Sequence, residues 1–186
     1  MDGTFDVVWL GRGGQGGVTA ALILAQAAVL RGYYALAIPF FGAERRGAPV
    51  FAYNRIAKTR ILTRSRVQRG DLLAVLDSTL LRTIKPEGLL KPTGAVVVNS
   101  TRLEEELSRV AQEMYCVDAL GIAEELNLRL AGIPLVNMPM VGAVARVSGL
   151  VSLDELLEAT KLQVKAKLSE NLKAVEEGWK LVEKCG

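Results

Sequence analysis

The chain has 186 residues, half of them hydrophobic, a formal net charge of +3, two cysteines and no histidine. This size and composition suit one domain spanning residues 1–186, and no apolar run is long enough to cross a membrane, so we expect a cytoplasmic protein without membrane contact. Without histidine, and with Cys116 and Cys185 far apart in sequence, the usual zinc, iron–sulfur and Ser-His-Asp or Cys-His sites are excluded. We therefore expect no metal ligands and no catalytic residues here, and any chemistry to take place in another chain.

The charge is distributed unevenly along the sequence. Residues 7–69 contain ten Arg and Lys against one acid, Glu44, which gives this part a charge of +9, whereas residues 1–6 and 70–186 carry 13 bases against 19 acids. A basic face suits a phosphate-bearing ligand, nucleic acid or an acidic protein surface. Solvated arginines at strand edges are an equally good explanation for the group at residues 60–69.

In chain order, the first feature is a glycine-rich turn between an apolar strand pattern at residues 5–10 and an apolar helix pattern at 18–30. The turn reads GRGGQGG at residues 11–17 and satisfies G-x-G-x-x-G, which is typical of dinucleotide-binding folds. Glycines allow a sharp turn, and the first N–H groups of the helix favour an anion. Because the helix is apolar on every face, it should be covered by a sheet and by either another subunit or close internal packing.

The rest of the chain alternates strand and helix patterns. This order predicts an α/β fold, a three-layer α/β/α Rossmann-like domain with a largely parallel or mixed sheet. The expected strands are at 34–38, halted by Pro39 before a loop at 39–49, at 50–56 in a hairpin with 61–62, at 71–76, at 94–99 and at 115–117. The expected helices are a weak one capped by Asp77 and ending at 84, one at 102–112 and one ending at 128. A small-residue helix then starts at Asn137, with Met138 and Met140 in the core, and one long final helix follows a capping box at Ser152.

Two other functions stay open at this point. An NAD site needs an acid at the end of the second strand, where the sequence has Ile38 and Pro39. An NADP site prefers arginine there, which Arg45 or Arg46 would supply, so a freestanding NADP-binding oxidoreductase module is the alternative function. The basic strip at 55–69 suggests nucleic acid, but no base-stacking motif accompanies it, and we expect no nucleic-acid partner.

Two motifs together carry a family resemblance. GRGGQG at residues 11–16 after the first strand and PFFGAERRG at 39–47 after the second resemble the gamma subunit of the 2-oxoacid:ferredoxin oxidoreductases. This subunit corresponds to domain III of pyruvate:ferredoxin oxidoreductase, and the pyruvate synthase type is the most similar. The resemblance continues to the end of the chain, at residues 71–77, Asn137-Met138, Gly142-Ala143, Asn171, Ala174 and Gly178.

The resemblance implies a subunit of a complex that oxidatively decarboxylates a 2-oxoacid. Such complexes convert the 2-oxoacid and coenzyme A to acyl-CoA and carbon dioxide and reduce ferredoxin. Thiamine diphosphate, Mg and the iron–sulfur clusters then belong chiefly to the alpha, beta and delta subunits, and ferredoxin reaches the complex through those subunits. The gamma chain by itself is expected to bind no cofactor, to support assembly and to lie near the entrance for coenzyme A.

The resemblance also suggests site residues. The N–H groups of Gly13 and Gly14, with the Gln15 amide, are expected to bind a phosphate or a carbonyl of a neighbouring chain. Arg45 and Arg46 are expected to pair with the phosphates of coenzyme A, a salt bridge to a partner subunit being the alternative. The sequence RRGAP at 45–49 resembles the pyruvate and branched-chain forms of the subunit more than the 2-oxoglutarate form.

Overall fold

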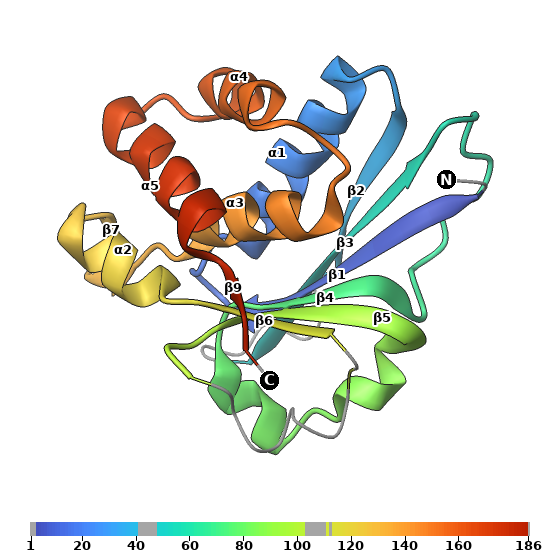
Figure 1. Cartoon of the computed structure of the whole chain (residues 1–186), viewed down its shortest axis with the longest axis horizontal. Helices are drawn as coiled ribbons and strands as arrows, with labels where there is room; N and C mark the ends of the chain where they lie inside the picture. The colour runs from blue at the N-terminus through green and yellow to red at the C-terminus, as the bar shows by residue number, and fades with distance from the viewer. Residues whose placement is uncertain (1–2, 41–47, 103–110, 112, 186) are drawn as a thin grey trace.

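The computed structural model describes residues 3–40, 48–102, 111 and 113–185. In this part of the chain, seven strands form one mixed sheet with the order β2-β3-β1-β4-β5-β6-β9, shown in Figure 1. The strands are β1 (Thr4–Arg12), β2 (Tyr34–Phe40), β3 (Pro49–Ala57), β4 (Gly70–Val75), β5 (Leu90–Asn99), β6 (Glu113–Val117) and β9 (Glu183–Lys184). Strands β1, β4, β5 and β6 run parallel, while β3 is antiparallel to both β1 and β2 and β9 is antiparallel to β6.

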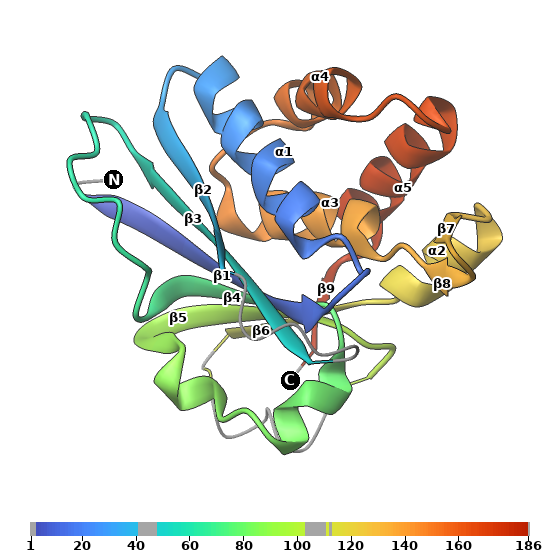
Figure 2. The same ribbon diagram turned by 180° about the vertical axis from the view of Figure 1, so that it is seen from behind.

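The long helices lie together on one side of the sheet, as Figures 1 and 2 show. Helices α1 (Gly17–Leu30) and α3 (Asn137–Ser148) contact the strands, while α4 (Leu153–Gln163) packs on α1 and α5 (Leu168–Leu181) packs on α3. Helix α2 (Ala119–Glu125) and the small sheet of β7 (Arg129–Leu130) and β8 (Ile133–Pro134) flank them. The turns η1 (Ser78–Arg82) and η2 (Pro86–Gly88) lie on the opposite side. The predicted α/β fold with a mixed sheet is therefore confirmed.

Alternating side chains of the central strands fill two cores, one on each face. Val7 and Trp9 of β1 point toward the helices, and Val8 and Leu10 point to the other side. All four are essentially inaccessible to solvent. A strand that is buried on both faces is apolar throughout, which explains why residues 5–10 read as a continuous apolar run.

A buried amide joins the sheet to α1. Asn54 of β3 is fully buried; its Oδ1 accepts from Trp9 Nε1 at 2.7 Å, and its Nδ2 donates to the carbonyls of Ala21 at 2.8 Å and Leu36 at 3.3 Å. One side chain thus connects β1, β2 and β3 with α1. Because these bonds are formed away from water, they hold the helix at one height above β1 and so position the turn between them.

Two expectations for the strands are corrected. Strand β2 does not stop at Pro39 but continues to Phe40, because β2 is the outermost described strand and an edge tolerates a residue without an N–H. Residues 61–62 form no hairpin with β3, because both edges of β3 are already hydrogen-bonded, to β1 and to β2. The helix expected at 102–112 lies almost entirely outside the described residues.

The long final helix is in fact two helices. The capping box is confirmed, since the Ser152 hydroxyl accepts from Glu155 N and the Glu155 carboxylate accepts from Ser152 N. However, α4 ends at Gln163, and α5 starts after Lys167, whose φ is +47°. Helix α4 packs on α1 and α5 packs on α3, so both need an apolar face. The apolar pattern in the sequence therefore continues across the break between them.

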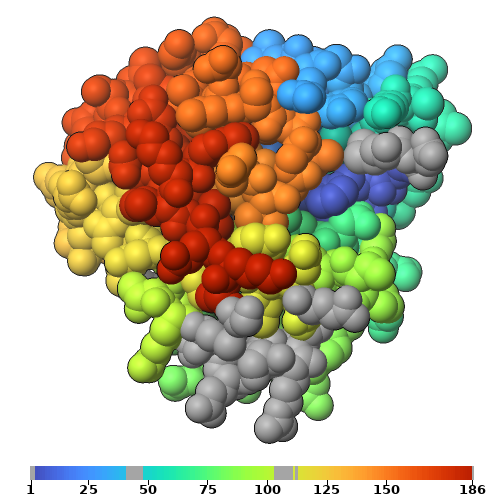
Figure 3. Space-filling view, viewed as in Figure 1, coloured from blue at the N-terminus to red at the C-terminus, as the bar shows by residue number. Residues whose placement is uncertain are grey.

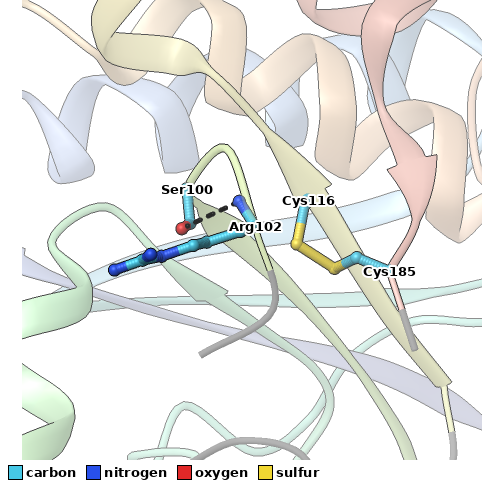
Figure 4. Close-up of a disulfide and its surroundings, with 4 residues drawn as sticks. All are labelled: Ser100, Arg102, Cys116 and Cys185. Carbon is cyan, nitrogen blue, oxygen red and sulfur yellow. Dashed lines mark hydrogen bonds between the residues drawn. A yellow bond between two sulfur atoms is a disulfide. The ribbon is translucent and has the colours of Figure 1, made fainter. Parts of the chain in front are cut away.

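The two cysteines form a disulfide, which the sequence did not lead us to expect. Cys116 of β6 is bonded to Cys185, and Cys185 N donates to Met114 O at 2.9 Å. Figure 4 shows the bond beside Arg102, whose N–H donates to the Ser100 hydroxyl. In the space-filling view the red C-terminal segment runs from α5 onto the yellow β6 region (Figure 3). The last residues of the chain are thus held against the sheet.

Candidate functional site

The glycine turn connects β1 with α1 and closes on itself. Its conformation requires glycine at two positions, because φ is +93° at Gly14 and +80° at Gly16. Gln15 N donates to Arg12 O at 3.2 Å, and Gln15 Oε1 accepts from Arg12 N at 2.7 Å. The Gln15 carbonyl oxygen therefore stabilises the turn, while Gly13 and Gly14 remain exposed.

The Arg12 side chain is also engaged. Its Nε donates to Asp77 Oδ2 at 2.6 Å and its Nη2 to Thr79 Oγ1 at 2.9 Å. Asp77 is the predicted cap, since its Oδ1 accepts from Thr79 N at the start of η1. Burial by itself would raise the pKa of Asp77, but the hydrogen bonds from Thr79 and Arg12 and the charge of Arg12 outweigh it, so the pKa is lowered. Asp77 is thus a structural carboxylate.

The start of α3 packs directly against the turn. A Cβ on Gly16 would lie 2.5 Å from Asn137 Nδ2, so this contact needs glycine as well. Asn137 is 4% exposed, and its Oδ1 has no hydrogen-bond partner among the described residues. A buried amide oxygen without a donor costs free energy unless something else supplies one.

A groove of about 930 Å³ opens beside the turn. Helices α1 and α3 begin at it, and no side chain caps the first N–H groups of either. The break before α5 and Asn171 near the start of α5 complete the lining. By contrast, Asp118 caps α2 and Ser152 caps α4. The lining residues are Arg12, Gly13, Gly14, Gly16–Thr19, Ala48–Val50, Leu130, Leu135, Asn137, Met138, Gln163–Ala166 and Asn171. Helix N-termini carry partial positive charge, so this arrangement favours an anion, and Lys165 adds a full charge.

The predicted site residues separate in the structure. Gly13 and Gly14 lie in the groove, whereas Gln15 faces a second cavity of about 390 Å³ together with Asp77 and Asp118. Arg45 and Arg46 lie outside the described residues, although the groove includes residues 48–50, which begin two positions after Arg46 in sequence.

Several groove residues were not predicted as site residues. Asn137 and Asn171 are buried amides at the starts of α3 and α5, and Lys165 belongs to the unpredicted break between α4 and α5. A buried asparagine in a small-residue helix is a signal that sequence inspection can use, but the break could not be inferred from it. Among the described residues, no group of three His, Cys, Asp or Glu could hold a metal ion, and no helix could span a membrane.

The fold and the glycine turn define an α/β domain in which a glycine-rich turn joins the central strand β1 to the helix α1. The sequence profile of the family described as pyruvate ferredoxin/flavodoxin oxidoreductase matches residues 6–181, and the chain belongs to this family as a subunit of gamma type. The resemblance inferred from the two motifs is thereby confirmed.

Individual relatives agree with this assignment. The chain is 46% identical to pyruvate synthase subunit PorC of Methanocaldococcus jannaschii, over 89% of this chain and 90% of the relative. It is 44% identical to the pyruvate/ketoisovalerate oxidoreductases common subunit gamma of Thermococcus kodakarensis, over 91% and 92%. The crystal structure of pyruvate oxidoreductase subunit PORC from Thermotoga maritima superposes with a TM-score of 0.82 at 32% identity and covers 100% of both chains. These relatives are subunits of larger oxidoreductases, which implies further subunits for this chain as well.

Proposed function

We propose that the groove beside the glycine turn is part of the coenzyme A site of a pyruvate-type 2-oxoacid:ferredoxin oxidoreductase, and that the chain assembles with alpha, beta and delta subunits. The observation that carries the proposal is the meeting of two uncapped helix starts, those of α1 and α3, at one groove that Lys165 also lines. Coenzyme A has several phosphate groups, and backbone N–H groups at helix N-termini bind phosphate without a charged side chain.

The walls of the groove suit the remainder of coenzyme A. The side chains of Val18, Leu135, Met138 and Val164 give the groove an apolar wall. An apolar wall accommodates the pantetheine arm of coenzyme A, whose amide N–H groups need acceptors when they are buried. Asn137 Oδ1 is such an acceptor without a partner among the described residues. In this arrangement Gly13 and Gly14 allow the ligand to approach the backbone, and Arg45 and Arg46 pair with its phosphates.

The other cofactors are assigned to other subunits. Iron–sulfur clusters need cysteine thiolates, and the two cysteines of this chain are bonded to each other. We therefore infer that thiamine diphosphate, Mg and the clusters are bound by the partner chains and that ferredoxin docks there. The contribution of this chain is to bind and orient coenzyme A and to support the assembly.

A negative charge at the start of α1 tests the proposal. Val18 lies in the first turn of α1 and lines the groove, and an acidic residue is favoured at a helix N-terminus, so Val18→Asp should fold. In the assembled complex it should raise the KM for coenzyme A by about 10-fold or more, because it repels phosphate and competes for the same N–H groups. The KM for the 2-oxoacid and the kcat at saturating coenzyme A should not change.

The control is Val18→Asn, because asparagine has nearly the same shape as aspartate but no charge. It should leave the KM for coenzyme A within about threefold of the original value. Equal KM values for both variants and the original complex would exclude phosphate binding at this helix start. If instead the isolated chain bound NADPH with micromolar affinity in calorimetry, the freestanding NADP-binding module would be the better assignment.

A further inference from the structure

The connection between β3 and β4, residues 58–69, is a basic loop. It carries five cationic side chains and no acid, and all five are exposed: Lys58, Arg60, Arg64, Arg66 and Arg69. Within the described residues, none of the five forms an ion pair. The loop therefore presents a concentrated positive charge that this part of the chain does not neutralise.

The basic loop is held in one arrangement. Arg55 of β3 pairs with the buried Asp6 at 2.9 Å, and its Nη1 donates to the carbonyls of Thr63 at 3.2 Å and Ser65 at 3.3 Å. Val67 is buried to 1% exposure in the core on the face away from the long helices. The loop is thus fastened at its middle and near its end, so its charges are positioned before any partner binds.

Apolar groups lie among these charges. Leu62 is 86% exposed, and it directly precedes Thr63, whose carbonyl accepts from Arg55. The Arg66 guanidinium lies 4.9 Å from the centre of the Phe40 ring and 5.9 Å from that of Tyr53, and Phe40 is itself 38% exposed. The loop thus combines an exposed aliphatic side chain with an arginine that lies over aromatic rings, and arginine and aromatic residues are enriched in protein interfaces.

We propose that the basic loop, with Leu62 and Phe40, is a docking surface for an acidic face of another subunit of the same complex. This inference rests on the proposed function, because it needs partner subunits. It does not depend on where coenzyme A binds. Five uncompensated cations repel one another, and an acidic partner removes this cost while it covers Leu62. A protein fits better than nucleic acid, because Arg66 already occupies the face of the Phe40 ring on which a base would stack.

Charge reversal tests the proposal in the assembled complex. The triple variant Arg60→Glu, Arg64→Glu, Arg69→Glu is compared with a control that reverses three exposed bases elsewhere, Arg82→Glu, Lys85→Glu, Lys173→Glu. Both change the net charge equally. The loop variant should bind the co-expressed partner subunits about 100-fold more weakly than the original chain, and its affinity should depend less on salt concentration. The affinity of the control should stay within about threefold of the original value. Leu62→Ser should weaken binding about 10-fold without changing the salt dependence.

Carbodiimide cross-linking identifies the occupant. Carbodiimide joins lysine to carboxylate without a spacer. Lys58 should therefore cross-link to acidic residues of a partner subunit. In an Arg60→Lys, Arg64→Lys variant, the two added lysines should do the same. Cross-links to a second copy of this chain, or loop-dependent retention on single-stranded DNA with no cross-link, would overturn the proposal. So would unchanged binding of the loop variant to its partners. If the unaltered chain failed to join any partner subunit, the proposed function itself would fail.

Discussion

The Nε of Arg12 lies 2.6 Å from Oδ2 of Asp77, so an ion pair joins the ends of the neighbouring parallel strands β1 and β4. Arg12 begins the glycine turn and Asp77 caps η1, and both side chains remain partly accessible to solvent. The pair fastens the turn at Arg12, which lines the groove, through Asp77, which lines the second cavity instead. A substitution at Asp77 therefore tests the stability of the turn without changing a side chain of the groove.

Asp77→Asn should destabilise the chain in a pH-dependent way. Because the folded-state pKa of Asp77 is lowered, its contribution to stability is present above the unfolded-state pKa and is lost as pH falls through the folded-state pKa. We expect a loss of about 1 kcal/mol in urea unfolding at pH 7 and a vanishing difference in strong acid. The exposed Glu125→Gln should show neither effect. A constant difference at all pH values would mean that the charge of Asp77 is irrelevant.

Gly178→Ala should destabilise the fold although alanine is the better helix former. The two helices α3 and α5 touch so closely that a Cβ on Gly178 would collide with the Pro139 carbonyl oxygen, and one on Gly142 with that of Val175. Backbone has to move in response, so we expect a loss of about 2–4 kcal/mol, against about 1 kcal/mol gained in helix propensity. Gly17→Ala is the control, since its Cβ would meet Leu76 at an ordinary 3.8 Å. Equal melting temperatures of the two variants would contradict this packing.

Reduction of the Cys116–Cys185 bond should loosen the C-terminus. The bond joins residues 69 positions apart, and β9 otherwise pairs with β6 through a very short strand. Cys185→Ser should lower the free energy of unfolding by about 2–4 kcal/mol and expose the C-terminus to carboxypeptidase. A reductant should produce the same change in the original chain and none in the variant. Two free thiols in the denatured, unreduced chain would show that the bond is not formed.

Arg45→Ala with Arg46→Ala should raise the KM for coenzyme A in the whole complex. Loss of two charge-assisted contacts to phosphate should change the KM by about 10-fold or more, with little change in the KM for the 2-oxoacid. Arg82→Ala with Lys85→Ala removes the same charge elsewhere and is the control. An unchanged KM combined with dissociation of the complex would favour the alternative, in which these arginines form salt bridges to a partner subunit.

Local patterns were sufficient for most of the elements. The apolar run before the glycines, the capping box at Ser152 and the cap at Asp77 depend on neighbouring residues, so their sequence signals are complete in themselves. The two motifs at residues 11–16 and 39–47 were likewise enough to indicate the family, which the comparisons confirm.

The groove depends on residues that are distant in sequence. Asn137 is more than a hundred positions from Gly16, and its contact with the turn follows from how α3 crosses the sheet. The break between α4 and α5, which brings Lys165 to the groove, follows from two helices covering two different neighbours. The break has no local signal, because the residues between Gln163 and Leu168 contain no glycine or proline.

The glycine turn shows the same division. The sequence by itself determined that a tight turn would follow β1, because its glycines permit positive φ, and the structure shows that Gly14 and Gly16 adopt it. Tertiary structure alone decided that Arg12 would reach Asp77 and that the starts of α1 and α3 would share one groove. These are relations between separate elements, and only packing, through the burial of both faces of the sheet, brings such elements together.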